Sequence, residues 1–177
     1  MKKLTNDELK VVQNEKSTQT MPIAILLDRV RSIHNVGSFF RTGDCAGVEK
    51  IFLCGYTAYP PRPEISKVAL GADETVPWEY VKDSEKMVRS IKDQGYRLIA
   101  VEQTDQSKNL YENPPPQTSC LVFGNEVDGI SYEILQHCES ALDLPMMGTK
   151  ESLNVSVCGG AVLFEVRRQF EAGLLID

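Results

Sequence analysis

Residues 142–165 read LDLPMMGTKESLNVSVCGGAVLFE, and this stretch decides the fold. It predicts a short apolar strand, a loop with Pro145 and Gly148, and then a helix. Ser152 and Asn154 are both suited to begin that helix, because their side-chain oxygens accept hydrogen bonds from its first free amides. A polar loop beside a buried helix start favours a binding site, although a simple strand-loop-helix connection explains this stretch equally well.

The first turns of the predicted helix, residues 155–164, are apolar or small on nearly every side. A helix of this kind is expected to be buried, since water would otherwise face apolar side chains all round it. Gly159 and Gly160 lower helix stability, so their presence indicates that another backbone or a ligand approaches closely. We therefore expect other structure to cover this helix on nearly every side.

Length and composition indicate a single globular domain. The chain has 177 residues, 42% hydrophobic and 25% charged, which suffices for a full core without disulfide or metal support. Its five cysteines form no CxxC pair and most have apolar neighbours, so we expect reduced core residues in a cytoplasmic protein. With two histidines we expect no metal site, and with no long apolar run we expect no membrane segment or signal peptide.

Strands and helices alternate along the chain after an N-terminal arm. Residues 1–21 are polar and predict a short arm with a weak helix pattern, and residues 22–177 predict one domain. Apolar runs predict buried strands, and periodic segments between them predict helices. The predicted strands are residues 23–27, 50–54, 78–81, 97–101 and 119–123, and the predicted helices are residues 35–47, 83–94 and 131–137. This alternation is typical of an α/β fold with a mainly parallel sheet flanked by helices.

Unusual sequence follows three of the predicted strands, at residues 28–41, 124–131 and 144–154. In open parallel sheets, ligands bind beyond the carboxyl ends of the strands. We therefore expect these three segments to form one pocket. Periodicity and spacing alone support only this description, an enzyme-like α/β domain with a pocket at three strand ends.

The segment 123–131, FGNEVDGIS, has the composition of a ligand-binding turn. Its two glycines let the backbone turn tightly and approach a ligand, while Glu126 and Asp128 offer hydrogen-bond acceptors. It lacks the Gly-Lys-Ser/Thr ending of a phosphate-binding loop, and its acidic residues would repel phosphate. A neutral or cationic ligand suits it better, although an ordinary glycine turn has the same sequence features.

Asn35 and Arg41 are candidates from the first of these segments. They are six residues apart, about 120° around a helix, so they reach one ligand only if Asn35 lies at the helix start. Arg41, among small and apolar neighbours, is either a structural ion-pair partner or a phosphate anchor. From its sequence context alone, the ion pair is the more common case.

Together the three segments resemble the signature motifs of the SpoU or TrmH-type RNA 2′-O-ribose methyltransferases of the SPOUT superfamily. Residues 35–47, NVGSFFRTGDCAG, resemble the first motif, and residues 123–131 resemble the second. Residues 144–148, LPMMG, and 152–156, SLNVS, resemble the third. The resemblance covers residues 22–170. It implies a C-terminal deep trefoil knot, an exception to the rule that chains are unknotted.

The resemblance implies an enzyme that uses S-adenosylmethionine to methylate a ribose 2′-hydroxyl of tRNA or rRNA. It assigns catalytic roles to Asn35, Arg41, Glu126 and Asn154. Since an arginine is very hard to deprotonate, we expect Arg41 to hold the target phosphate and stabilise the developing alkoxide. The other three would position Arg41 and the ribose. The cofactor-binding residues that the resemblance implies are Val101, Glu102, Gly124, Asn125, Leu144, Met146, Ser152 and Leu153.

Within these 177 residues we expect no large added RNA-binding domain, which would be a departure from the family pattern. Its net charge of −6 also argues against a general affinity for polyanions. RNA recognition would then rely on local basic residues or on a second subunit, and the resemblance implies a homodimer. Apolar Val166 and Phe170 and the Phe-rich segment 35–47 favour a homodimer too. The basic residues are Arg29, Arg31, Arg41, Arg62, Lys67 and Lys150.

Two rival interpretations belong to other functional classes. A non-catalytic RNA-binding or assembly module would keep the same fold, but the intact set of polar motif residues argues against it. Those residues are Asn35, Arg41, Glu126 and Asn154. A nucleotide-binding enzyme unrelated to methyl transfer is disfavoured because the sequence has no phosphate-binding loop.

Overall fold

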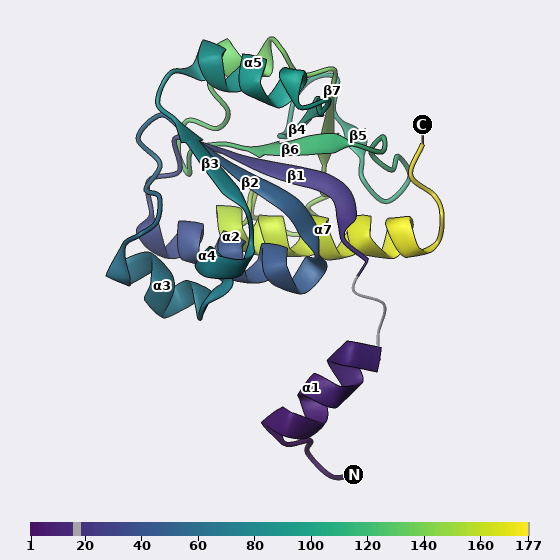
Figure 1. Cartoon of the computed structure of the whole chain (residues 1–177). Coiled ribbons are helices and arrows are strands. Elements are labelled where there is room, and N and C mark those ends of the chain that lie inside the picture. Colours follow the sequence, from purple (N-terminus) through teal and green to yellow (C-terminus); the bar gives the residue numbers. More distant parts are fainter. Residues whose placement is uncertain (16–18, 177) are drawn as a thin grey trace.

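The computed structural model describes residues 1–15 and 19–176, and these include one seven-stranded sheet (Figure 1). The strands are β1 (Met21–Asp28), β2 (Val48–Cys54), β3 (Trp78–Val81), β4 (Arg97–Val101), β5 (Lys108–Asn109), β6 (Ser119–Phe123) and β7 (Ser140–Asp143). Neighbouring strands are all parallel, in the order β3-β2-β1-β6-β4-β7-β5. The predicted α/β fold with a mainly parallel sheet is therefore confirmed.

Helices cover both faces of this sheet. The helices are α1 (Asn6–Glu15), α2 (Ile33–Ala46), α3 (Pro63–Ala69), α4 (Ala72–Thr75), α5 (Ser84–Asp93), α6 (Tyr132–Leu135) and α7 (Val155–Glu171). In Figure 1, α2, α3, α4 and α7 lie on one face and α5 lies on the other, where α6 packs beside it. The short elements α4 and β5 were not predicted, because neither carries a periodic apolar pattern.

The central strand β1 shows how the apolar runs build this layered arrangement. Ile23, Ile25 and Leu27 belong to the core beneath α2 and α7, whereas Ala24 and Leu26 belong to the core beneath α5. All five side chains are fully buried. Successive side chains of a strand point to opposite faces, so a continuous apolar run supplies both cores at once. The polar segments are thereby left to the ends of the strands.

Helices α2 and α7 pack closely against each other where α7 has a glycine. A Cβ on Gly159 would lie 2.6 Å from Cζ of Phe39, too close for two carbon atoms. Gly159 thus has a close neighbour, but this is a side chain of α2 and not the backbone or ligand that was predicted. At Gly160 a Cβ would have ordinary contact, 3.9 Å from Cγ2 of Thr42.

One face of α7 is open to solvent. Val157 and Phe164 are 56% and 53% exposed, and Ala161 between them is also exposed. The expected burial of residues 155–164 is therefore only partial within this chain, because α2 and the sheet cover only part of the helix circumference. Val166 and Phe170, which favoured a homodimer, instead pack into the core of this chain.

The predicted N-terminal arm contains α1, which begins with a reciprocal cap. The Thr5 amide donates to Oε2 of Glu8 at 2.7 Å, and the Glu8 amide donates to Oγ1 of Thr5 at 3.3 Å. Strand β1 begins at the fully buried Met21, one residue before the predicted domain. Part of the arm, residues 16–18, lies outside the described residues. Among the helices that the structure describes, none is long and apolar enough to cross a membrane.

Candidate active site

A pocket of about 550 Å³ lies where β4, β6 and β7 end. Its wall comes from residues 101–103 after β4, residues 123–129 after β6, and residues between 142 and 158. Among the described residues, four carboxylates line the pocket and no Lys, Arg or His does; the four are Glu102, Glu126, Asp143 and Glu151. A wall of this charge favours a ligand with a cationic group and disfavours a phosphate.

The turn after β6 is a tight hairpin closed by its own backbone. Asn125 and Gly129 exchange two backbone hydrogen bonds, and a side chain at Gly124 would overlap the backbone of Gly129. The Asn125 side chain holds the turn from inside, since its Oδ1 accepts from the amides of Val127 and Asp128. Its Nδ2 donates to the Arg29 carbonyl and to the Tyr56 hydroxyl, each at 2.9 Å. Asn125 therefore shapes the pocket wall with its whole side chain.

Two carboxylates form hydrogen bonds with the C-terminal end of the same turn, and they come from the chain at the ends of the two strands that flank β6. Oδ2 of Asp28, at the end of β1, accepts from the Ser131 amide at 2.7 Å. Oε2 of Glu102, after β4, accepts from the Ile130 amide at 3.2 Å. Asp28 is completely buried, so this hydrogen bond is shielded from water. These two hydrogen bonds thus fix the turn at its C-terminal end.

Glu126 joins this turn to the start of α2. Its carboxylate accepts from the amides of Arg31 and Ser32 at 2.9 and 3.0 Å, and from Nδ2 of Asn35 at 2.8 Å. Burial alone would raise the pKa of Glu126, but the hydrogen bonds from Arg31, Ser32 and Asn35 together lower it below the usual value. The group is therefore a stable carboxylate with its acceptor sites occupied, which suits positioning better than proton transfer.

Asn35 connects Glu126 to the start of α7. Its Oδ1 accepts from Nδ2 of Asn154 at 3.3 Å and from the Ser156 hydroxyl at 3.2 Å. Asn154 is also the N-cap of α7, because its Oδ1 accepts from the amides of Ser156 and Val157. Of the two predicted caps, Asn154 is therefore correct and Ser152 lies before the helix. The network joins residues up to 121 positions apart in sequence.

Arg41 stands apart from this network. It lies on the exposed side of α2, six residues after Asn35 and about 9 Å further along the helix axis. Within residues 1–15 and 19–176 its side chain makes no ion pair or hydrogen bond, and it does not line the pocket. The ion-pair interpretation of Arg41 therefore finds no partner in the part of the chain that the structure describes.

The structure brings most of the predicted site residues together. All eight predicted cofactor-binding residues line the pocket, and so do Glu126 and Asn154. Asn35 contacts both of these, whereas Arg41 does not reach them. Sequence reasoning missed other lining residues, among them Gln103, Asp143, Glu151 and Cys158. Glu151 lies within the predicted segment 144–154 and Asp143 directly precedes it. Their acidic side chains were the only sequence signal that could have identified these two residues.

Cys158 is a partly buried thiol in the pocket wall. Burial, and after it the negative charge of Glu102, raise the pKa of Cys158 to about 11. The thiol is therefore protonated near neutral pH and is a poor nucleophile. Among the described residues, no group of three or more His, Cys, Asp or Glu side chains is arranged to hold a metal ion.

The segments that build this pocket lie within a single family match. The sequence model of the SpoU rRNA Methylase family matches residues 22–164. The chain belongs to this family. The predicted resemblance is therefore confirmed, and all three motif segments fall within the matched range.

Curated relatives of this SpoU-family chain are ribosomal RNA methyltransferases. The 23S rRNA (guanosine-2'-O-)-methyltransferase RlmB of Neisseria meningitidis serogroup B is 37% identical over 148 residues, which cover 84% of this chain and 59% of that protein. The corresponding protein of Haemophilus ducreyi is 32% identical over 168 residues, covering 95% of this chain and 67% of that protein. The chain spans about three fifths of the length of most of the curated relatives that it matches.

Solved structures of SpoU-type enzymes share the fold. The TrmH/SpoU tRNA modifying enzyme of A. aeolicus has a TM-score of 0.78 at 27% identity, over 95% of this chain and 85% of that chain. The SpoU methyltransferase AviRb of Streptomyces viridochromogenes, solved in complex with the cofactor AdoMet, has a TM-score of 0.76 at 25% identity. That match covers 84% of this chain and 58% of AviRb.

Proposed function

We propose that this SpoU-family chain is an S-adenosylmethionine-dependent RNA methyltransferase that modifies a ribose 2′-hydroxyl of ribosomal RNA. The observation that carries the proposal is the acidic pocket where the three motif segments meet around the Glu126, Asn35 and Asn154 network. Its curated relatives are named for guanosine 2'-O-methylation of 23S rRNA, which supports rRNA as the substrate over tRNA.

The pocket fits S-adenosylmethionine by its charge, surface and size. The sulfonium and ammonium groups of that molecule are cationic, and the described part of the chain offers four carboxylates and no basic side chain to the pocket wall. Leu142, Leu144 and Met146 provide apolar surface for an adenine ring. The volume of about 550 Å³ lies within the common range for small-molecule sites. AviRb, a neighbour in fold, was solved with AdoMet.

Two groups of pocket residues would hold the cofactor in different ways. Backbone groups and apolar side chains would contact it directly, at Val101, Gly124, Leu144, Met146, Ser152 and Leu153. Glu102 and Asn125 would act by shaping the wall, since protein amides already occupy their side-chain oxygens. When bound, the cofactor supplies a methyl group that is already activated by a positively charged sulfur.

The residues of the chain then have to align the ribose hydroxyl and stabilise its developing charge. Alignment of reacting groups supplies much of the rate in such transfers. Asn35 and Asn154, fixed by Glu126 and by the cap of α7, would position the ribose at the mouth of the pocket. Arg41 would hold the target phosphate and stabilise the developing alkoxide, because a guanidinium stays protonated and binds oxyanions in two-pronged geometry.

A homodimer would bring Arg41 to a pocket. Helices α2 and α7 form one layer, in which exposed Arg41 accompanies the exposed apolar residues Val157, Ala161 and Phe164 of α7. Burying this apolar stripe against a second copy is favourable, and it would let Arg41 of the partner subunit serve the site. Light scattering at micromolar concentration tests the dimer, and a monomer would contradict it.

Three further features belong to the same proposal. The C-terminal region would form a deep trefoil knot, supported by the SpoU family match and by the contacts of Asn154 and Ser156 with Asn35. Residues 1–21 would be an arm and residues 22–177 a single methyltransferase domain, supported by the family match from residue 22. An rRNA substrate and five free cysteines support a cytoplasmic location. An experimental structure that traces an unknotted chain would contradict the knot.

Calorimetry with S-adenosylhomocysteine tests the cofactor assignment. We expect binding by the unaltered protein and weaker binding by Leu153→Trp, since Leu153 lines the pocket and is 44% exposed. Leu174→Trp is a matched control, because Leu174 is 47% exposed and lies outside the pocket. Absence of binding at millimolar ligand, or equal binding by the two variants, would contradict the assignment.

A further inference from the structure

The loop between β2 and α3, residues 55–62, presents aromatic rings and an arginine to solvent. Tyr56 is 59% exposed, and Tyr59 is 37% exposed. The Tyr59 ring stacks on Tyr80, with centroids 4.0 Å apart and planes 25° from parallel. The guanidinium carbon of Arg62 lies 6.0 Å from the Tyr59 centroid. The loop thus combines flat π-surfaces with positive charge, the two features that bind unpaired nucleotides.

Hydrogen bonds fix this loop to the ends of β1 and β3. The buried Thr57 hydroxyl donates to the Leu27 carbonyl at 3.1 Å and accepts from the Val30 amide at 3.0 Å. The Tyr80 hydroxyl donates to the Gly55 carbonyl at 2.8 Å. A loop held in this way presents its rings in one arrangement, so little further ordering is needed when a ligand stacks on them.

Tyr56 is tied directly to the candidate active site. Its hydroxyl accepts from Nδ2 of Asn125 at 2.9 Å, and Asn125 is the pocket residue that precedes Glu126. Two other exposed tyrosines, Tyr111 and Tyr132, make no side-chain hydrogen bond within residues 1–15 and 19–176. The Tyr56 ring is therefore anchored at its polar end while its apolar face lies in water.

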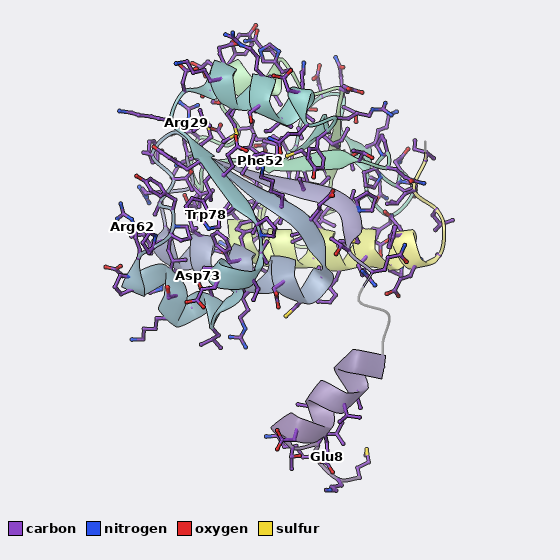
Figure 2. The ribbon with its side chains drawn as sticks, in the orientation of Figure 1. Glu8, Arg29, Phe52, Arg62, Asp73 and Trp78 are labelled. Carbon is purple, nitrogen blue, oxygen red and sulfur yellow. The ribbon has the colours of Figure 1, made fainter. Side chains whose placement is uncertain are left out.

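Arginines lie in and beside this loop, since Arg62 belongs to it and the Arg29 side chain lies against Gly55. Arg31 and Arg62 are exposed and make no ion pair in the described part of the chain. Nε of Arg29 lies 3.6 Å from Asp28, and its Nη2 lies 3.7 Å from Glu133. Figure 2 shows Arg29 and Arg62 on the same flank of the molecule. On a protein of net charge −6, this flank offers local positive charge for phosphates.

We propose that Arg31, Tyr56, Tyr59 and Arg62 form a docking surface for single-stranded RNA, in which a base next to the methylated ribose stacks on Tyr56. The proposal rests on the proposed function for its substrate class and identifies the part of this chain that holds the RNA. Unpaired RNA bases stack on aromatic side chains, and arginines bind the flanking phosphates. Such stacking tolerates any base, so this surface adds affinity and alignment without fixing the sequence.

Tyr56 variants test the proposal with two readouts, the KM for RNA in methyl transfer and the affinity for a fluorescent single-stranded oligouridylate. Tyr56→Ala is expected to raise the KM and the oligonucleotide Kd on the order of tenfold, since a stacked base is lost. Tyr56→Phe keeps the ring and is expected to stay near the unaltered protein. Tyr111→Ala, at 57% exposure, is the matched control and should change neither value.

Calorimetry with S-adenosylhomocysteine separates RNA docking from damage to the pocket, and Tyr56→Ala should leave this affinity within about twofold. The docking surface is wrong if Tyr56→Ala binds the oligonucleotide as the unaltered protein does, if neither binds it, or if Tyr56→Phe loses as much as Tyr56→Ala. If the unaltered protein binds the oligonucleotide through Tyr56 but methylates no RNA, the proposed function fails and the docking surface stands.

Discussion

The substitution Glu126→Gln tests whether the motif segments are held together by one charged hydrogen-bonding group. Glu126 accepts three hydrogen bonds at 2.8–3.0 Å, from the Arg31 and Ser32 amides and from Asn35. Glutamine keeps one oxygen for Ser32 and Asn35, but it turns an NH2 group toward the Arg31 amide. One acceptor and the negative charge are therefore lost, while the volume of the side chain is kept.

The expected cost follows from these contacts. Hydrogen bonds to charged groups contribute about 1.5–3 kcal/mol each. Glu126 is only partly buried, so we expect a loss near the lower end, about 2 kcal/mol in the free energy of unfolding. In a domain of this size, that corresponds to a fall of about 4–8 °C in melting temperature. Asp128→Asn is the matched control, because the exposed Asp128 carboxylate makes no hydrogen bond in the described residues.

Urea unfolding at several pH values measures this effect and its electrostatic origin. The folded protein lowers the pKa of Glu126, so its stabilising effect is full above the ordinary glutamate pKa of about 4.3 and is lost as pH falls through the lowered value. The difference between the unaltered protein and Glu126→Gln should therefore shrink in acid. A Glu126→Gln variant as stable at pH 7 as Asp128→Asn would refute the reasoning.

Three other predictions concern α7, Arg41 and Cys158. Gly159→Ala should destabilise the protein by about 1–3 kcal/mol in urea unfolding, because the added methyl group would overlap Phe39. Gly160→Ala is the control and should be neutral or stabilising. Equal effects of the two substitutions would contradict the packing of α7 on α2. Arg41→Ala should slow methyl transfer on the order of a hundredfold or more while melting temperature and S-adenosylhomocysteine affinity stay unchanged, and Arg41→Lys should recover only part. Retained turnover would show that Arg41 is not catalytic. Iodoacetamide at pH 8 should modify the exposed Cys45 before Cys158, because the raised pKa of Cys158 keeps it a protonated thiol. Peptide mapping that finds Cys158 modified first would contradict this prediction.

The parallel sheet and the place of the site could be predicted because both follow from local patterns. The predicted bounds of β3, β4 and β6 agree with the structure residue for residue. Alternation with helices makes the strands parallel, and parallel strands bring their carboxyl ends to one edge. The pocket at three of these ends then follows, as the positions of Gly124, Leu144 and Leu153 in its wall illustrate.

The hydrogen-bond network could not be predicted, because it depends on strand order. Glu126 and Asn35 are 91 residues apart, and they meet only because β6 pairs directly with β1. The hydrogen bond from the Ser131 amide to Asp28 also depends on the pairing of β6 with β1. Nothing in the sequence near Asp28 indicates this partner 103 residues away. Periodicity carries no information on such pairings.

The exposed face of α7 could not be predicted for a different physical reason. Apolar side chains such as Val157 and Phe164 have the same sequence pattern whether a core or another molecule covers them. Phe39 and Phe40, by contrast, are fully packed inside the chain, and Phe39 fills the space that Gly159 leaves. A sequence pattern therefore indicates that a surface is covered without indicating what covers it.

Nucleoside analysis of methylated RNA is the most direct test of the central claim. Unmodified ribosomal RNA would be incubated with the purified protein and S-adenosylmethionine carrying a labelled methyl group, and then digested to nucleosides. We predict that the label appears in 2′-O-methylated nucleosides, because the pocket and its Asn35 network present a ribose hydroxyl to the cofactor. Label found only in base-methylated nucleosides, or no transfer by a protein that binds the cofactor, would contradict the account.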